Sequence, residues 1–349
     1  MTVSHHKVRP AKVSYYLREQ DLRKDNDTGS CSSGQEFPLA EWMVYGPTDH
    51  MTSAALELDS GPWKSPVDAK TFKLLAQGFA RRNGLSKKPL VQNAGSPKRV
   101  ALHDFTLSAP KSVSVVWALS DQITRQAIEY AQQHAAHAFL KLLGRDAAYS
   151  RQGRAGCIKT PCSLVAALFP HFVSRSADPQ LHTHCTFLNV AVRPDGTTGS
   201  LETLGIMGMI GVAATRYHEA LAENMQEIGF GVQQKGKLFE IEGVSDQVCL
   251  AFSQRRTAAL LDAHAWLSSV GKKSDDQTPS RALMRKSVLR TRPAKKLQSL
   301  DHLRYDWLQR AELSDFEANH CIPRSGKGHW GLIDPEDEVR SSRHLREVG

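Results

Sequence analysis

The feature that most constrains the fold is a pair of apolar runs, containing β-branched residues, that together carry three histidines. The runs are Leu164–Val173 and His182–Val192, and a short polar stretch separates them. This pattern predicts two β-strands and a connection. Because successive side chains of a strand point to opposite faces, His182 and His184 share one face, and a neighbouring strand can supply His171.

Three neutral imidazoles that meet on one face form a ligand set for a metal ion with open coordination positions. A substrate oxygen can fill such positions, as in catalytic rather than structural sites. The alternative is three unrelated core or surface histidines, which is the usual interpretation of a lone histidine. Two histidines on the same strand face, beside a third on a neighbouring strand, favour the metal site.

Three more residues are candidates for chemistry near that site. A metal-ligating histidine usually donates its other ring N–H to a carboxylate or carbonyl, and Asp104 is the candidate acceptor, although an ordinary turn aspartate is the alternative. Tyr15 and Tyr16 are adjacent, and on their own they suit packing or an interface. Near a metal-bound phosphodiester, however, a tyrosine hydroxyl can attack phosphorus and form a covalent intermediate.

The charge distribution suits a polyanionic partner. The chain has 45 Lys plus Arg against 36 Asp plus Glu, a net charge of +9. Between Gly271 and Arg310 there are 11 basic and 4 acidic residues, so 11 − 4 = +7 of that charge lies in one segment. This segment predicts a surface for a phosphate backbone, and the alternative is a solvated helical face.

The length of 349 residues exceeds one ordinary core of about 100 to 200 residues and predicts a main body plus an accessory part. No apolar run approaches the roughly 18 residues of a membrane helix, and the N-terminus lacks a signal-peptide core. We therefore expect a soluble, intracellular protein without membrane insertion. The six cysteines form no CxxC pair and are expected to be reduced. Cys157 and Cys162 are expected to be core or loop thiols, and His134 and His137 to be structural.

Periodicity and turn residues predict the remaining organisation. We expect helices at Ile123–Leu143, closed by Gly144, and at Met209–Ile228, with helical spacing in Val67–Phe79. A hairpin is expected across Phe230–Ile241, loops at Lys24–Gly34 and Ser86–Arg99, and a half-buried segment of uncertain type at Ser112–Trp117. The predicted parts are a main body at 1–243, a mainly helical, basic portion at 244–313, and a flexible tail at 314–349.

The assembled motifs resemble the relaxase domain of MobF-family conjugative relaxases, a group of HUH endonucleases. Four stretches carry the resemblance in the family's order, over roughly Val13 to Leu313. They are Val13-Ser14-Tyr15-Tyr16, the run from Asp104 to Ser114 with Ser108-Ala109-Pro110-Lys111-Ser112 inside it, the stretch His171 to His184 with Asn189 beyond it, and Gly236 to Val244.

The resemblance implies an α+β fold with a central five-stranded antiparallel sheet flanked by helices and a mainly helical, basic C-terminal portion. It also implies a nickase and strand transferase that cuts single-stranded DNA at the transfer origin, oriT. Tyr15 would attack to give a 5′-phosphotyrosine and a free 3′-hydroxyl, reversibly, with Tyr16 beside it. Asp104 would orient a histidine or assist Tyr15.

By the same resemblance His171, His182 and His184 hold a divalent metal ion, Mg²⁺ or Mn²⁺ or another divalent ion, and Arg175 contacts DNA. The basic residues expected at the DNA are Arg175, Lys111, Arg285, Lys286, Arg290 and Arg292. The implied protein is a cytoplasmic, bacterial, mobile-element-encoded monomer that can enter the recipient cell with the DNA. Its implied partners are oriT single-stranded DNA, accessory relaxosome proteins and a type IV secretion coupling protein.

Two departures from the family pattern stand out. The second tyrosine pair of many members is replaced here by Leu22-Arg23-Lys24, which leaves open whether a second tyrosine acts in strand transfer. A GxxxxGK[ST] phosphate loop is also missing, so the chain is either a piece of a longer protein or a relaxase without a helicase. The alternative functions are an HUH rolling-circle replication initiator or transposase, and an inactive single-stranded DNA-binding module.

Overall fold

A single antiparallel sheet organises the molecule. The computed structural model describes residues 3–18, 40–58, 65–82, 86–236, 238–270, 278–293, 300–314, 316 and 321. The strands of the sheet lie in the order β1 (Val3–Val8), β6 (Leu102–Ser108), β10 (Pro179–Leu188), β9 (Leu164–Val173), β2 (Glu41–Tyr45) and β3 (Ser65–Pro66). Every neighbouring pair is antiparallel. The predicted five-stranded sheet is confirmed, and β3 adds a two-residue pairing at one edge.

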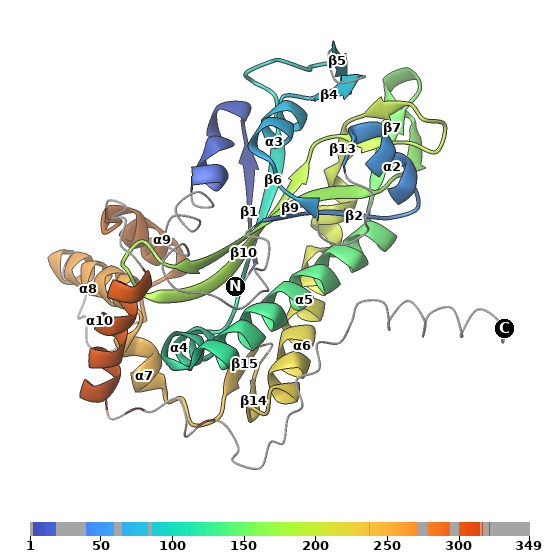
Figure 1. Ribbon diagram of the computed structural model, residues 1–349. Helices are drawn as coiled ribbons and strands as arrows, with labels where there is room; N and C mark the ends of the chain where they lie inside the picture. The colour runs from blue at the N-terminus through green and yellow to red at the C-terminus, as the bar shows by residue number, and fades with distance from the viewer. Residues whose placement is uncertain are drawn as a thin grey trace.

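Each face of the sheet carries its own apolar core, because strand residues alternate between the faces. Phe105, Leu168 and Phe187 belong to one core, which includes side chains of α4 (Lys111–Leu119), α5 (Gln122–Asp146), α6 (Thr203–Glu227) and α10 (Leu300–Leu313). Phe169 and Leu188 belong to the other core, with residues of the N-terminal segment, α2 (Asp49–Leu56) and α3 (Ala69–Ala76). Figure 1 shows α5 and α6 crossing below the sheet and α3 above it.

Short strands outside the main sheet pair in four small antiparallel sheets. They are β4 (Phe79–Arg82) with β5 (Ser86–Pro89), β7 (Tyr149–Gln152) with β8 (Ile158–Pro161) and β13 (Leu201–Glu202), β11 (Ala191–Val192) with β12 (Thr198–Gly199), and β14 (Val232–Lys235) with β15 (Leu238–Ile241). The predicted hairpin across residues 230–241 is confirmed. The predicted loop at 86–99 is wrong at its start, because β5 pairs with β4 there, and its charged, exposed side chains gave no strand signal.

Helix α5 runs past the glycine predicted to end it. Asp121 caps its start by accepting a hydrogen bond from the amide of Thr124. A Cβ at Gly144 would lie 2.7 Å from the Cβ and carbonyl oxygen of Tyr45. This glycine therefore permits a close approach between α5 and β2 instead of stopping the helix.

Two other helices differ from the prediction in informative ways. Helix α6 begins at Thr203 rather than Met209, because the Glu202 side chain caps the amides of Leu204 and Gly205. The segment of uncertain type is helix α4, in which Ser112 to Ala118 are all buried. A helix buried on all sides shows no amphipathic period, so its sequence could not be distinguished from a strand.

The segment after the sheet is helical, as predicted. It contains α7 (Asp246–Ala251), α8 (Gln254–Ser269), α9 (Arg281–Arg290) and α10. Helices α8 and α9 pack on each other through a small cluster of Ala263, Leu267 and Leu283, whereas Trp307 of α10 enters the main core beside Trp117. The predicted loop at 24–34 lies outside the described residues, as does the tail from 314 apart from residues 314, 316 and 321. No described helix is both long enough and apolar enough to cross a membrane.

Candidate active site

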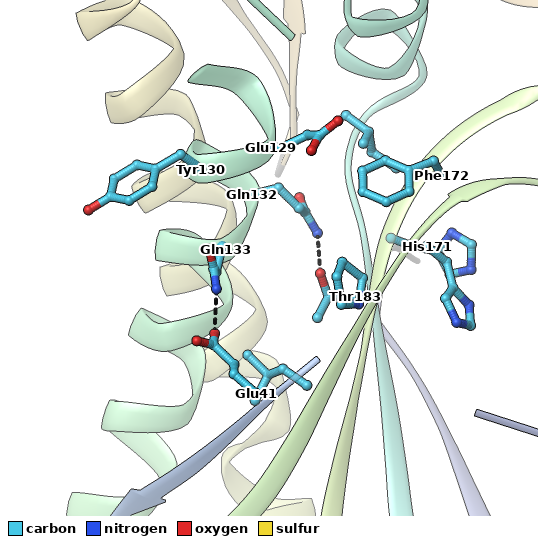
Figure 2. A pocket seen from close by; sticks show the side chains of 12 residues that line it. Glu41, Glu129, Tyr130, Gln132, Gln133, His171, Phe172 and Thr183 are labelled. Atoms are coloured by element: carbon cyan, nitrogen blue, oxygen red, sulfur yellow. Dashed lines mark hydrogen bonds between the residues drawn. The ribbon is translucent and has the colours of Figure 1, made fainter. Parts of the chain in front are cut away.

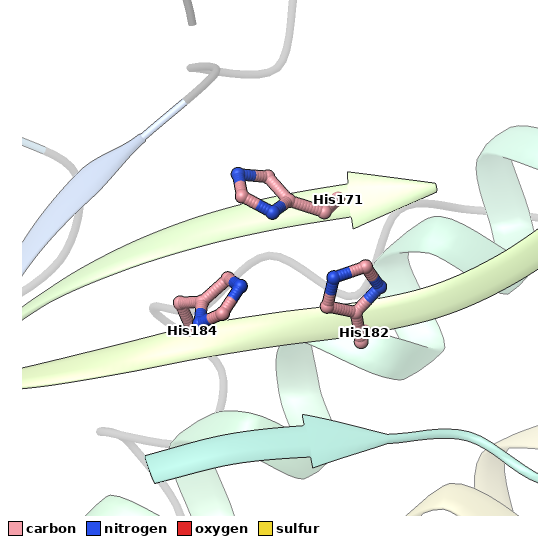
Figure 3. A group of neighbouring side chains, drawn as sticks. All are labelled: His171, His182 and His184. Atoms are coloured by element: carbon pink, nitrogen blue, oxygen red, sulfur yellow. The ribbon is translucent and has the colours of Figure 1, made fainter. Parts of the chain in front are cut away.

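Strand register brings the three histidines together. His171 of β9 lies opposite His182 of β10, and His184 lies two residues further along β10 on the same face. Their ring centroids are 4.7 to 5.3 Å apart, and their ligand nitrogens all lie within 4.8 Å of one another. Figure 3 shows the three rings converging from two adjacent strands. The predicted triad is thus a spatial cluster.

The chemistry of this donor set fits a divalent metal ion. His182 Nδ1 donates to the carbonyl oxygen of Gln180 at 2.8 Å, and His184 Nδ1 donates to Asp104. These bonds leave Nε2 of both rings as the atom with a lone pair for a metal. Burial lowers the pKa of His182 well below its usual value, and the neighbouring His171 and His184 lower it further. His182 is therefore neutral at pH 7, as metal ligation requires.

Asp104 connects the triad to the tyrosine pair. It lies on β6, the neighbour of β10, and its side chain is buried. Its Oδ2 is 2.8 Å and its Oδ1 3.0 Å from His184 Nδ1, and Oδ2 also accepts a 2.9 Å hydrogen bond from the Tyr16 hydroxyl. Of the two predicted roles, the geometry matches the orientation of a histidine. The tyrosine that this carboxylate holds is Tyr16.

Tyr16 is buried, although the sequence analysis placed both tyrosines in the catalytic set. Its ring packs against Phe72 and Phe169, which also contact each other, and only 4% of the residue is exposed. Burial raises the pKa of the Tyr16 phenol far above its usual value, and the charge of Asp104 raises it further. The hydroxyl therefore stays protonated and acts as a donor that holds Asp104 in place, a supporting position rather than that of a nucleophile.

Tyr15 lies edge-on to two of the three histidines. It lies in the helical stretch 14–18, and its ring centroid is 6.3 Å from those of both His171 and His184, edge-on to each. Burial raises the pKa of the Tyr15 phenol, whereas the charges of Arg175 and Arg292 lower it. Two of the predicted DNA contacts therefore lower the pKa of Tyr15. The Tyr16 ring also lies beside the triad, with its centroid 5.4 Å from that of His184, but its hydroxyl is bound to Asp104.

The Ser-Ala-Pro-Lys-Ser motif holds the start of the histidine strand. Ser114 Oγ accepts a 3.0 Å hydrogen bond from the amide of Leu181, the residue before His182. Ser112 donates its hydroxyl to Glu240 of β15, and its oxygen accepts the amide of Ile241. The second and fourth motifs that the sequence analysis singled out therefore meet in the structure and brace β10.

Lys111 does not present its charge to solvent. Its Nζ donates to the carbonyl oxygens of Pro179 at 2.8 Å and Phe252 at 3.1 Å. Burial lowers the pKa of Lys111, although the nearby Asp178 raises it. The geometry therefore gives Lys111 a bracing role between β10 and the segment before α8, in place of the predicted DNA contact.

The other predicted DNA-binding residues lie on or just after α9. Arg285, Lys286 and Arg292 are exposed. Arg290 is bound to Asp262 of α8, with its Nη2 2.6 Å from Oδ2. Three of these four basic side chains are thus available to a ligand, and Arg290 joins the two helices.

The residues predicted to be structural have structural partners. His137 Nε2 lies 2.7 Å from the buried Glu41 carboxylate, and His134 Nδ1 accepts from Asn224 at 3.0 Å. Cys157 is an exposed free thiol and Cys162 a buried one, in keeping with loop and core thiols. Neither belongs to a cluster of metal-ligating side chains among the described residues.

A small cavity lies behind the triad, between α5 and strands β9 and β10. It has a volume of about 40 Å³. Figure 2 shows Gln132 bonded to Thr183 and Gln133 bonded to Glu41 there, while the His171 ring points away from it. These polar side chains belong to the packing of α5 on the sheet, and the triad faces the opposite side.

One charged neighbour of Arg175 and Arg292 was missed by the sequence analysis. Arg255, at the start of α8, lies close enough to Arg175 and Arg292 that both charges lower the pKa of its guanidinium, after burial itself. In the sequence it stands in an Arg-Arg pair outside the counted basic segment. Only the packing of α8 against the β9–β10 turn reveals its neighbours.

The comparison with known families agrees with these features. The family model of the TrwC relaxase matches residues 11–313. The chain belongs to the TrwC relaxase family. The resemblance to MobF-type relaxases is therefore confirmed.

Curated relatives support the assignment over a shorter span. The Multifunctional conjugation protein TraI of Escherichia coli is 32% identical over 180 residues, which cover 47% of this chain and 10% of that protein. TraI of Escherichia coli strain K12 is 32% identical over 177 residues, with 46% and 10% covered. The matched region thus spans about a tenth of the length of these relatives.

Solved structures confirm the fold. The metal-bound conjugative relaxase TrwC in complex with oriT DNA is 23% identical, with 90% of this chain and 99% of that chain covered at a TM-score of 0.70. A copper-bound TrwC complex with oriT DNA covers the same shares at 23% identity and a TM-score of 0.68. The α+β relaxase architecture, with its helical C-terminal part, is therefore established for this chain.

Proposed function

We propose that the chain is a site- and strand-specific nickase and strand transferase that cleaves single-stranded DNA at a transfer origin. The observation that carries the proposal is the placement of Tyr15 edge-on to two histidines of the triad. Membership of the TrwC relaxase family supports the same activity. So do the titles of the similar structures, which name oriT DNA as the ligand of TrwC.

The reaction is a transesterification at phosphorus. The Tyr15 phenol oxygen attacks the scissile phosphate and gives up its proton, the bond from phosphorus to the 3′ oxygen breaks, and that oxygen takes up a proton as a free 3′-hydroxyl. The 5′-phosphate remains on Tyr15. Because one phosphoester replaces another, the reverse attack by the 3′-hydroxyl religates the strand.

The side chains around Tyr15 would have different roles in this reaction. His171, His182 and His184 would hold the divalent ion, and that ion would neutralise the non-bridging oxygens of the phosphate. Asp104 fixes the orientation of His184, and the Tyr16 hydroxyl fixes Asp104. Arg175 and Arg292 place positive charge where the phenolate forms and lower the pKa of Tyr15, against the larger effect of burial, which raises it.

The remaining expectations belong to the same proposal. Mg²⁺ or Mn²⁺ is the ion we expect, and the cytoplasm of a donor cell the place of cleavage. The partners we expect are relaxosome proteins and a coupling protein. Residues 244–313 would close over the DNA as a clamping portion, joined to the 1–243 core through Lys111 and through Trp307 of α10.

The test is a cleavage assay on single-stranded oligonucleotides tiled across the transfer origin of the encoding element. Protein is mixed with DNA labelled at its 5′ end or, in a parallel reaction, at its 3′ end, in the presence of Mg²⁺ or Mn²⁺ or of EDTA, and resolved on a denaturing gel; the 5′ label follows the released fragment and the 3′ label follows the adduct. We expect one labelled product that ends in a free 3′-hydroxyl, and a protein–DNA adduct, only with metal. Salt-sensitive binding without any adduct would instead identify a DNA-binding module.

A further inference from the structure

Three arginines from separate segments lie near one another, and two of them, Arg175 and Arg292, also lie near Tyr15. Arg175 lies in the turn between β9 and β10, Arg255 on the first turn of α8, and Arg292 just after α9. The charges of Arg175 and Arg292 lower the pKa of the Tyr15 phenol, and both charges also lower the pKa of the Arg255 guanidinium. We call Arg175, Arg255 and Arg292 the arginine cluster.

Hydrogen bonds fix the two segments that carry Arg175 and Arg255 against each other. The amide of Gln254, the residue before Arg255, donates to the Asp178 carboxylate at the end of the β9–β10 turn. The same turn is tied to α10, because Trp307 Nε1 donates to the Ala177 carbonyl oxygen at 2.8 Å. Figure 1 shows β9 and β10 reaching into the group of helices α8, α9 and α10.

The turn itself has a defined shape. Ser174 Oγ accepts the amides of Ser176 and Asp178, and Ala177 adopts a left-handed conformation with φ of +60°. A side chain on such a braced turn is presented in a restricted direction, which favours a binding role for Arg175.

Within the part of the chain that the structure describes, no carboxylate is paired with the arginine cluster. The ion pairs of the described residues include none formed by Arg175, Arg255 or Arg292. The nearby Asp178 is buried and already bound to Arg310 Nη1 at 3.0 Å. Arg175 and Arg255 are partly buried and Arg292 is exposed. Placing like charges together is unfavourable, and more so where they are partly buried, unless an anion joins them.

Among the three arginines, Arg255 most clearly has hydrogen-bond donors that the described protein groups do not use. Its Nε is buried and has no hydrogen-bond partner. Arg99, Arg193 and Arg304 also have a buried Nε without a partner, but their terminal nitrogens donate to the protein. Among the described hydrogen bonds there is none from the Arg255 side chain, so its donors are available to a ligand.

We propose that Arg255, with Arg175 and Arg292, binds a backbone phosphate of the single-stranded DNA next to Tyr15. Guanidinium groups match the geometry of phosphate oxygens and donate to them in pairs. That the anion is a DNA phosphate rests on the proposed function. Arg255 would therefore belong to the substrate site although it lies outside the segment in which the basic charge is concentrated.

The experiment neutralises one phosphate at a time and asks which arginine variant responds. A fluorescein-labelled transfer-origin oligonucleotide is made as a series with one methylphosphonate linkage each, and its affinity is measured by anisotropy in EDTA, which prevents cleavage. The proteins are the full chain, Arg255→Gln, and the control Arg256→Gln. Arg256 is the next residue on the same helix; it is exposed, and its charge lowers the pKa of the Asp246 carboxyl.

For the unmodified strand we expect Arg255→Gln to bind about tenfold more weakly than the full chain, as for the removal of a charged hydrogen bond. At one position of the series, the methylphosphonate should lower the affinity of the unmutated protein for the strand about tenfold. At the same position it should lower the affinity of Arg255→Gln no further. Arg256→Gln should bind unmodified DNA like the full chain and keep the full penalty at that linkage.

Two outcomes would overturn the proposal. One is an unchanged affinity of Arg255→Gln for unmodified DNA; the other is a methylphosphonate profile identical to that of the full chain. Mn²⁺ binding by the histidine triad, measured by calorimetry, should be the same in all three proteins and verifies their folding. Because the readout is affinity in EDTA, it is independent of the adduct assay, so a failure of the nickase proposal would be seen separately.

Discussion

The metal centre and the α8–α9 pair are held in place by different means. His171, His182 and His184 sit on the two central strands of a sheet with an apolar core on each face. Helices α8 and α9 pack through a small buried cluster that includes Ala263 and Leu283, and the Asp262 carboxylate of α8 binds Arg290 of α9. The strand register fixes the ligand geometry, whereas a small apolar cluster holds the helices that carry the predicted DNA-binding residues.

This difference indicates a division of labour. Catalytic groups must be held within a fraction of an ångström, which a packed sheet provides. Binding of a flexible strand tolerates a more loosely attached surface, since elements with little buried apolar surface open at low cost. Chemistry and DNA binding should therefore be separable by mutation, and the following predictions test that separation.

The largest effect is expected at the tyrosine that faces the triad. Tyr15→Phe removes the nucleophilic oxygen and should lower the rate of single-turnover cleavage by at least about a thousandfold. Affinity for the uncleaved oligonucleotide, measured by anisotropy, should be unchanged. Tyr16→Phe is the matched control and should be milder, since it removes only the bond that holds Asp104. Full cleavage by Tyr15→Phe would refute the assignment of the nucleophile.

The next effect concerns the support of the metal centre. Asp104→Asn keeps the shape of the side chain but removes the charged acceptor of His184. We expect metal affinity, measured by calorimetry with Mn²⁺, to fall by about 10- to 100-fold, while DNA affinity stays the same. If metal affinity were unchanged, the carboxylate would have no part in tuning the triad.

A smaller effect is expected on the exposed face of α9. Arg285→Gln combined with Lys286→Gln should weaken DNA binding by roughly threefold to tenfold at low salt. The slope of affinity against salt should fall by about 0.7 for each phosphate that the variant no longer binds. Mn²⁺ binding should not change. An unaltered salt slope would exclude this face from the DNA surface.

The smallest effect is expected at the residue that joins the two helices. Arg290 is committed to Asp262, and exposed pairs of this kind contribute little. Arg290→Gln should therefore change DNA affinity by less than about twofold under the same conditions. A reduction as large as that of the α9 double variant would mean that Arg290 leaves Asp262 to bind DNA.

The catalytic face was predictable because its signals are local. Strand alternation placed His182 and His184 together, and the order of the motifs pointed to Asp104 and Tyr15. Their geometry depends on pairing in one antiparallel sheet, which short apolar runs with turn signals indicate well. The supporting position of Tyr16 was not predictable, because it depends on the packing of its ring against Phe72 and Phe169 and on its bond to Asp104.

The positively charged residues were harder to assign. The sequence around a lysine or arginine does not indicate whether its side chain contacts solvent, a carbonyl oxygen or another charged group. Lys111 braces two carbonyls, Arg290 pairs with Asp262, and Arg255 joins the arginine cluster only through the packing of α8 on a distant turn. Each of these outcomes depends on long-range packing that local patterns do not contain.

The central claim is that Tyr15 attacks the scissile phosphate while Tyr16 supports Asp104. The most direct measurement is peptide mapping of the covalent product by mass spectrometry, after cleavage of the cognate strand with Mn²⁺ and nuclease trimming of the DNA. The account predicts a nucleotide attached through its 5′-phosphate to Tyr15. A nucleotide on Tyr16, or cut DNA with no modified tyrosine, would contradict it.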